Sequence, residues 1–181
     1  MVFSSLLFIF IYLPVTLAVY YLVPKKWRNI WLFAVNLVFY GWGEPVYILL
    51  MIFSIIVNYT AGYMVDRHRD RGRQIIAVSV VINLGLLMFF KYYDFIAANL
   101  SLIPALSFIR PLGISLPIGI SFYTFQTMSY PIDVYRGDGR VQKNFVSFGN
   151  FVVLFPQLIA GPIVRYKDID DQLSERHENI A

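Results

Sequence analysis

The sequence contains no cysteine and little charge. Without cysteine, the chain can form no disulfide, no thiol-linked haem and no thiolate metal site. Only 14% of its residues are charged, against about 25% in ordinary soluble domains, and 58% are hydrophobic. Charged residues are absent from five long runs, namely residues 1–24, 46–65, 74–90, 111–132 and 145–164. A single soluble core could hardly bury so many uncharged runs, so a soluble protein is the less favoured class.

These charge-free runs predict membrane-spanning helices, because a span needs roughly 17–25 apolar residues. The predicted fold is all-α, a polytopic membrane helical bundle with broken or re-entrant segments. The expected spans are residues 2–23, 30–43, 46–65, 74–90 and 111–130, while residues 145–164 either cross the membrane or re-enter it. Residues 95–109 are expected at the membrane surface because Pro104 interrupts them, and residues 167–181 are expected to form an amphipathic cytoplasmic tail.

Basic residues lie between the expected spans rather than inside them. Three follow the first span, at Lys25, Lys26 and Arg28; four more lie within residues 67–73, and three within residues 136–143. Lysine and arginine are enriched in cytoplasmic loops, so the N-terminus is predicted to lie outside. The net charge of +4 therefore reflects topology and does not predict nucleic-acid binding. No positive region precedes the first apolar run, so a cleaved signal peptide is not expected.

One apolar segment, Phe155–Tyr166, is interrupted too often to be a regular span. It contains Pro156, Gly161 and Pro162, and Arg165 lies near its end. Irregular backbone at membrane depth is tolerated only where protein or a water-filled cavity satisfies its polar groups. We therefore predict that this segment lines a cavity, whether it crosses the membrane or re-enters it.

Polar side chains near the last two apolar runs are candidates for the wall of that cavity. Gln126 and Gln157 need hydrogen-bond partners at membrane depth, and Asp133 with Arg136 could equally be a local pair that fixes a turn. The full candidate set is Gln126, Tyr130, Asp133, Arg136, Gln157 and Arg165. Four other charged residues near span ends are interpreted as interfacial: Glu44, Lys91, Asp94 and Arg110.

The sequence offers no catalytic residue and no metal site. His68 lies among arginines and His177 lies in the polar tail, so both are interpreted as solvated. No spacing of His, Asp and Glu fits a metal site, and no nucleophile or phosphate-binding motif is present. The tripeptide Asn58-Tyr59-Thr60 matches a glycosylation pattern, but it lies inside an expected span and is given no weight.

Several longer motifs, in order along nearly the whole chain, resemble the membrane-bound O-acyltransferase family. The similarity is to its bacterial branch that O-acetylates polysaccharides such as alginate. The matching stretches are residues 1–5 (MVFSS), 39–45 (FYGWGEP), 83–87 (NLGLL), 90–92 (FKY), 116–126 (LPIGISFYTFQ), 129–137 (SYPIDVYRG) and 155–166 (FPQLIAGPIVRY). Pro131 departs from the pattern of this branch, which has an aliphatic residue there.

The resemblance implies a ring of tilted helices around a funnel in the bacterial inner membrane. Through this funnel a cytoplasmic acyl donor, acetyl-CoA, would reach a polysaccharide acceptor outside, with periplasmic or membrane O-acetylation proteins as partners. The six candidate residues then become funnel residues. The catalytic histidine of the family lies in later helices, and neither His68 nor His177 matches it. Residues 1–166 are therefore expected to be the N-terminal transmembrane part of the acyltransferase domain, and the chain alone is expected to be inactive.

Two other functions are compatible with broken membrane helices. A transporter or channel subunit predicts a second half related to the first by pseudo-symmetry. The acyltransferase predicts instead a downstream apolar segment that carries a lone histidine. A non-catalytic membrane scaffold is the remaining alternative.

Overall fold

The computed structural model describes residues 5–103, 106, 108–154 and 166. The π-helical turn η1 (Phe8–Tyr12) continues into α1 (Leu13–Leu22), and α2 (Lys25–Gly43) follows after a short turn. Next come α3 (Ile48–Arg67), the 3-10 turn η2 (Arg69–Arg71), α4 (Gly72–Leu100), α5 (Ile120–Arg136) and the short α6 (Phe145–Val153). Within these residues every regular element is a helix, which confirms the predicted all-α class.

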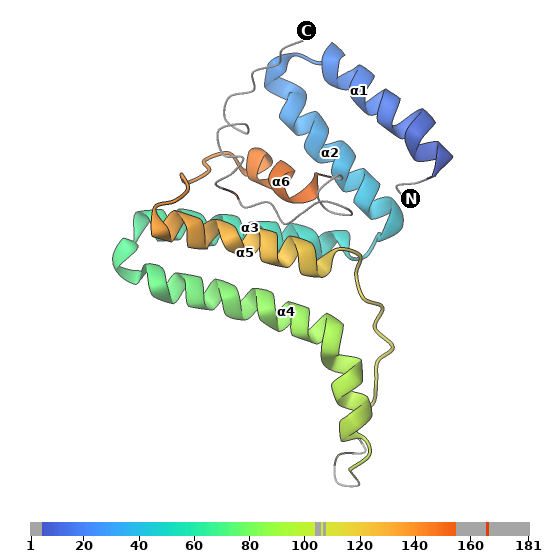
Figure 1. Ribbon diagram of the computed structural model, residues 1–181, viewed down its shortest axis with the longest axis vertical. Coiled ribbons are helices and arrows are strands. Elements are labelled where there is room, and N and C mark those ends of the chain that lie inside the picture. The colour runs from blue at the N-terminus through green and yellow to red at the C-terminus, as the bar shows by residue number, and fades with distance from the viewer. Residues whose placement is uncertain (1–4, 104–105, 107, 155–165, 167–181) are drawn as a thin grey trace.

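Helices α3, α4 and α5 pack against one another in all three pairings and form the centre of the structure (Figure 1). Helix α6 contacts α2, α3 and α5, and α2 in turn contacts α1. In space, therefore, α6 and α2 pack on the central helices α3–α5, and α1 packs on the far side against α2. The last turns of α4 bend away from the other helices in Figure 1.

Two of these helices are long and apolar enough to cross a membrane, Ile48–Arg67 and the combined segment Arg69–Leu100. The core helix of a soluble protein would be mostly buried, but only 17% of the most apolar window of Arg69–Leu100 is buried. Large apolar side chains such as Leu49, Val78 and Val81 are instead exposed. An apolar helix that presents apolar side chains outward fits a lipid environment. The described helices are thus those of a membrane protein.

Three helices have boundaries that differ from those expected. Helix α2 begins at Lys25 rather than near residue 30, so its basic residues form the first helical turn. Helix α4 continues ten residues beyond 90, to Leu100, because Lys91 and Asp94 do not interrupt it. The expected span 111–130 is wrong in its first part, since α5 begins only at Ile120 and continues to Arg136.

Residues 111–119 are non-helical because their glycines and prolines prevent a helix. Gly113 and Gly119 have φ angles of 68° and 75°, in the left-handed region that other residues rarely adopt. The segment is held from α4 by Asp94, whose two carboxylate oxygens accept hydrogen bonds from the backbone N–H groups of Leu112 and Ile114, each at 2.8 Å. Asp94, interpreted from the sequence as interfacial, is therefore an anchor for this segment.

A cluster of polar side chains joins the three central helices. Asn58 of α3 and Asn83 of α4 exchange two amide hydrogen bonds, each 3.0 Å long. Ser79 donates to Asn58 Oδ1 at 3.0 Å, and Ser54 donates to Asn83 Oδ1 at 3.2 Å. The Ser54 hydroxyl also lies 3.3 Å from that of Thr127 on α5. All five side chains are almost fully buried, so we call them the polar cluster.

The two amides of the polar cluster use all of their hydrogen-bonding capacity. The second N–H of Asn58 donates to the carbonyl of Ser54 at 2.8 Å, and that of Asn83 donates to the carbonyl of Ser79 at 2.7 Å. Each Oδ1 accepts from the opposite amide and from one serine. A buried amide is stabilising only when its groups are paired, so this complete pairing specifies both the depth and the rotation of α3 and α4.

Close packing of small residues brings α5 onto α3. A methyl group added at Gly62 of α3 would collide with the ring of Tyr130 on α5. One added at Gly72, at the start of α4, would lie 2.6 Å from the ring of Tyr135. Small residues at such crossings let backbones approach closely, which is a common way for helices to associate in membranes.

We predict that the amide pair contributes measurable coupling between α3 and α4. Asn58→Leu and Asn83→Leu keep the side-chain volume but remove the amide, and each should lower the free energy of unfolding by about 1–2 kcal/mol. The double variant should lose less than the sum, with a coupling energy of about 0.6–1.7 kcal/mol. Reversible unfolding in mixtures of mild detergent and dodecyl sulfate measures all three values.

Asn99→Leu is the matched control, because Asn99 is also on α4 but is exposed and bonds only within its own helix, to Phe95. It should change the free energy of unfolding by less than about 0.5 kcal/mol. Strict additivity of Asn58→Leu and Asn83→Leu would show that the two amides do not interact.

We predict opposite effects from alanine at two glycines. Gly62→Ala should lower the free energy of unfolding by about 1–3 kcal/mol, because Tyr130 must move. Gly85→Ala, with no neighbouring atom within 4 Å, should raise it by about 0.5–1 kcal/mol through helix propensity. The same unfolding assay compares them, and equal effects at the two sites would contradict the close contact of α3 with α5.

Candidate functional site

Three of the predicted funnel residues lie on one buried face of α5. Gln126, Tyr130 and Asp133 are spaced by four and three residues, which places them on the same side of a helix. Their exposed fractions are 3%, 0% and 5%. This face packs toward α6 and Tyr166, and we call it the polar face of α5.

Gln126 connects α5 to the end of α6. Its Nε2 donates a hydrogen bond of 2.7 Å to the carbonyl oxygen of Phe151. Carbonyls in the last turn of a helix lack an intrahelical partner, so this side chain satisfies one of them. Gln126 was expected to need a hydrogen-bond partner at membrane depth, and that partner is a backbone carbonyl of the neighbouring helix α6.

Tyr130 lies at the centre of an aromatic cluster. Its ring is 4.5 Å from that of Phe148 and 4.7 Å from that of Tyr166, measured between centroids. Its hydroxyl oxygen accepts a hydrogen bond of 3.0 Å from the backbone N–H of Gln142. Gln142 in turn donates from Nε2 to the hydroxyl of Tyr166 at 3.4 Å. Tyr130 therefore orders both the loop before α6 and Tyr166, which lies after α6 in the sequence.

Asp133 and Arg136 do not form the turn that the sequence suggested. Asp133 lies inside α5, and the loop after it begins only at Gly137, whose φ of 80° ends the helix. The carbonyl of Asp133 accepts from the N–H groups of Asp138 and Gly139 at 3.0 and 3.3 Å, which caps the helix end. The Asp133 side chain is buried, whereas Arg136 is exposed.

The remaining two candidates, Gln157 and Arg165, lie outside the described residues. The same holds for most of the segment Phe155–Tyr166, which is predicted to line a cavity. The structure thus brings together Gln126, Tyr130 and Asp133 and leaves Arg136 at the surface. The joint role of all six stays a prediction.

Sequence reasoning missed the side chains that position α6. Asn144 caps its N-terminus by accepting from the N–H groups of Val146 and Ser147, at 2.9 and 3.3 Å. Asn150 donates to the carbonyl of Asn29 on α2 at 2.7 Å. Asn150 lies inside the apolar run 145–164, and this position could have indicated its contact with another helix, because a buried amide must find a hydrogen-bond partner.

The described side chains can bind and orient a polar group, and Asp133 adds a buried carboxylate to the polar face of α5. His68 is exposed in the turn after α3, in agreement with its interpretation as solvated. No group of three or more His, Cys, Asp or Glu residues in the described part of the chain could hold a metal ion. The other buried polar side chains of the described residues are amides and hydroxyls, which hold helices together and offer hydrogen bonds.

Comparison with known proteins identifies relatives along nearly the whole chain. This chain is 41% identical over 187 aligned residues to a protein named probable alginate O-acetylase from Pseudomonas aeruginosa. The alignment covers 99% of this chain and 36% of that protein. A protein of the same name from Azotobacter vinelandii is 40% identical, with 99% and 37% covered. The peptidoglycan O-acetyltransferase of Helicobacter pylori is 30% identical, with 98% and 39% covered.

The chain spans little more than a third of the length of these curated relatives. No protein-family model matches it, and no solved structure matches it either. The high coverage of this chain, across relatives that share one chemistry, confirms the resemblance drawn from the motifs. This chain is similar, over almost all of its length, to proteins named alginate O-acetylase.

Proposed function

We propose that this chain forms part of a membrane-bound O-acyltransferase that passes acetyl groups to a polysaccharide. The donor is acetyl-CoA on the cytoplasmic side of the bacterial inner membrane, and the acceptor is an alginate-type polysaccharide outside. The observation that carries the proposal is the similarity of 99% of the chain to named alginate O-acetylases. The more distant relative acts by name on peptidoglycan, so the shared chemistry is O-acetylation of a polysaccharide.

The reaction sets clear requirements for the protein. A sugar hydroxyl attacks the thioester carbonyl of the donor, the new C–O bond forms, the C–S bond breaks, and a base moves the hydroxyl proton toward the leaving thiolate. Such catalysis needs a base within hydrogen-bond reach and donors aimed at the developing oxyanion. The resemblance places the catalytic histidine of the family in later helices, so we assign the described residues to the wall that surrounds the reaction rather than to the reacting centre.

The polar face of α5 is our candidate for that wall. Gln126 and Tyr130 fix α6, and the segment that follows α6 is the broken motif Phe155–Tyr166. Positioning matters because small displacements of bound groups cost large factors in rate. In this proposal α5 holds α6 so that the broken motif, with Gln157 and Arg165, faces the funnel.

The basic loops support the proposed orientation with the N-terminus outside. Residues 67–73, where α3 is joined to α4, carry four arginines, and residues 136–143 carry three further basic residues. Gly72 after the first loop lies against Tyr135 before the second, so both loops are at the same end of the helices (Figure 1). A common positive end fits the cytoplasmic side. The further partners in this proposal are periplasmic or membrane proteins of the O-acetylation pathway.

A chimeric protein tests the proposed function. The matching segment of the Pseudomonas aeruginosa relative would be replaced by this chain, in an alginate-producing strain that lacks its own O-acetylase. We expect acetate on the secreted alginate to be restored. Gln126→Leu in the chimera should lower the acetate content about tenfold or more, because α6 loses its anchor.

Phe125→Leu is the matched control, because Phe125 neighbours Gln126 on α5 but is 41% exposed. It should leave acetylation unchanged, and immunoblots of membranes should show equal amounts of every chimera. A chimera that accumulates normally in the membrane while the alginate stays unacetylated would contradict the proposed function.

A further inference from the structure

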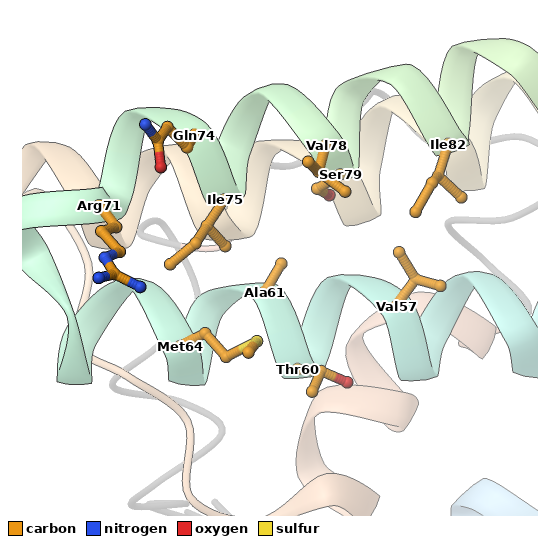
Figure 2. A pocket seen from close by; sticks show the side chains of 10 residues that line it. All are labelled: Val57, Thr60, Ala61, Met64, Arg71, Gln74, Ile75, Val78, Ser79 and Ile82. Atoms are coloured by element: carbon orange, nitrogen blue, oxygen red, sulfur yellow. The ribbon is translucent and has the colours of Figure 1, made fainter.

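An apolar groove runs between α3 and α4 (Figure 2). Its walls are formed by Val57 and Met64 of α3 and by Ile75, Val78 and Ile82 of α4. The two hydroxyls that border it are already engaged: Thr60 donates to the carbonyl of Ile56, and Ser79 donates to Asn58 of the polar cluster. The groove therefore presents mostly apolar surface, and its other polar lining residues, Gln74 and Arg71, lie near one end.

The dimensions of the groove fit a single hydrocarbon chain. Its volume is about 300 Å³. From Arg71 to Ile82 it follows eleven helical steps of α4, or about 16 Å, which is half of the roughly 30 Å hydrocarbon layer. A packed helix is about 10 Å wide and crosses both leaflets. An acyl chain of one leaflet matches both the length and the width better.

One cationic side chain lies at one end of the groove. Figure 2 shows the guanidinium of Arg71 between the two helices, beside Met64. Its Nε is 3.8 Å from Asp70 Oδ2, and both side chains are 75% exposed, so this pair is weak and leaves the other donors of the guanidinium accessible. A guanidinium binds phosphate with several donors at once.

We propose that this groove binds one acyl chain of an anionic phospholipid, whose phosphate is held by Arg71. The arrangement has the polarity of such a lipid, with a cation at the membrane surface and an apolar channel that descends through one leaflet. Arg67 and Arg73, near the same end, add positive potential that favours an anionic headgroup. The site is distinct from the polar face of α5 and goes beyond the proposed acyl transfer.

Lipid retention by the purified chain tests this proposal. The 181-residue protein in mild detergent would be titrated with phosphatidylglycerol or phosphatidylcholine of identical acyl chains, and bound lipid counted by native mass spectrometry. We expect one phosphatidylglycerol to bind about tenfold more tightly than phosphatidylcholine. Arg71→Gln should remove this preference, and Val78→Phe, at a 60% exposed groove position, should abolish retention of both lipids.

Two matched variants complete the design. Arg73→Gln removes a neighbouring charge that does not line the groove, and Val81→Phe adds the same ring to α4 at a 70% exposed position outside it. Val81→Phe should bind as the unaltered chain does, and Arg73→Gln should weaken phosphatidylglycerol binding much less than Arg71→Gln. Circular dichroism should show equal helix content in all variants. The proposal is overturned if Arg73→Gln weakens binding as much as Arg71→Gln, if Val78→Phe leaves retention unchanged, or if the unaltered chain retains no lipid.

Discussion

The reciprocal amide pair of Asn58 and Asn83 is the interaction on which the remaining structure depends. In an apolar environment an unpaired amide is costly, and here the two amides satisfy one another completely with the help of two serines. Only one rotation and one relative depth of α3 and α4 permit this pairing. The hydroxyl of Thr127 extends the polar cluster to α5 and thereby places the third central helix.

The position of α5 then determines where polar groups meet near the candidate funnel. With Thr127 on the polar cluster, Gln126 and Tyr130 are directed to α6 and to the loop before it. The entry to α5 is fixed separately, because Asp94 holds residues 112 and 114 by their backbone. The position of α5 is thus set by two groups of hydrogen bonds. One is at Thr127 in the middle of the helix, and the other holds the segment before its first residue. Together they locate the polar face of α5, which we assign to the wall of the acyl-transfer funnel.

Local composition predicted the helices but not their partners. The charge-free runs 46–65 and 74–90 correctly indicated the apolar helices α3 and α4, and the motifs resembled those of the relatives that the comparison found. Glycine and proline were given weight in Phe155–Tyr166, whereas the same residues in 111–119 were read as part of a span and proved to interrupt it. Asn58 was seen only within a glycosylation pattern, because its partner is 25 residues away in the sequence and pairing across helices leaves no local signal.

The central claim is that the polar cluster sets the packing of α3 against α5, and disulfide formation in membranes tests it most directly. The chain has no cysteine, so the pair Ser54→Cys and Thr127→Cys reports without background. Mild oxidation should join the two sulfurs nearly completely and protect them from thiol reagents. A control pair at exposed positions of the same helices, Ile56→Cys and Phe125→Cys, should stay reduced. If the first pair stayed reduced while both cysteines were present, or if the control pair cross-linked equally, the account would be contradicted.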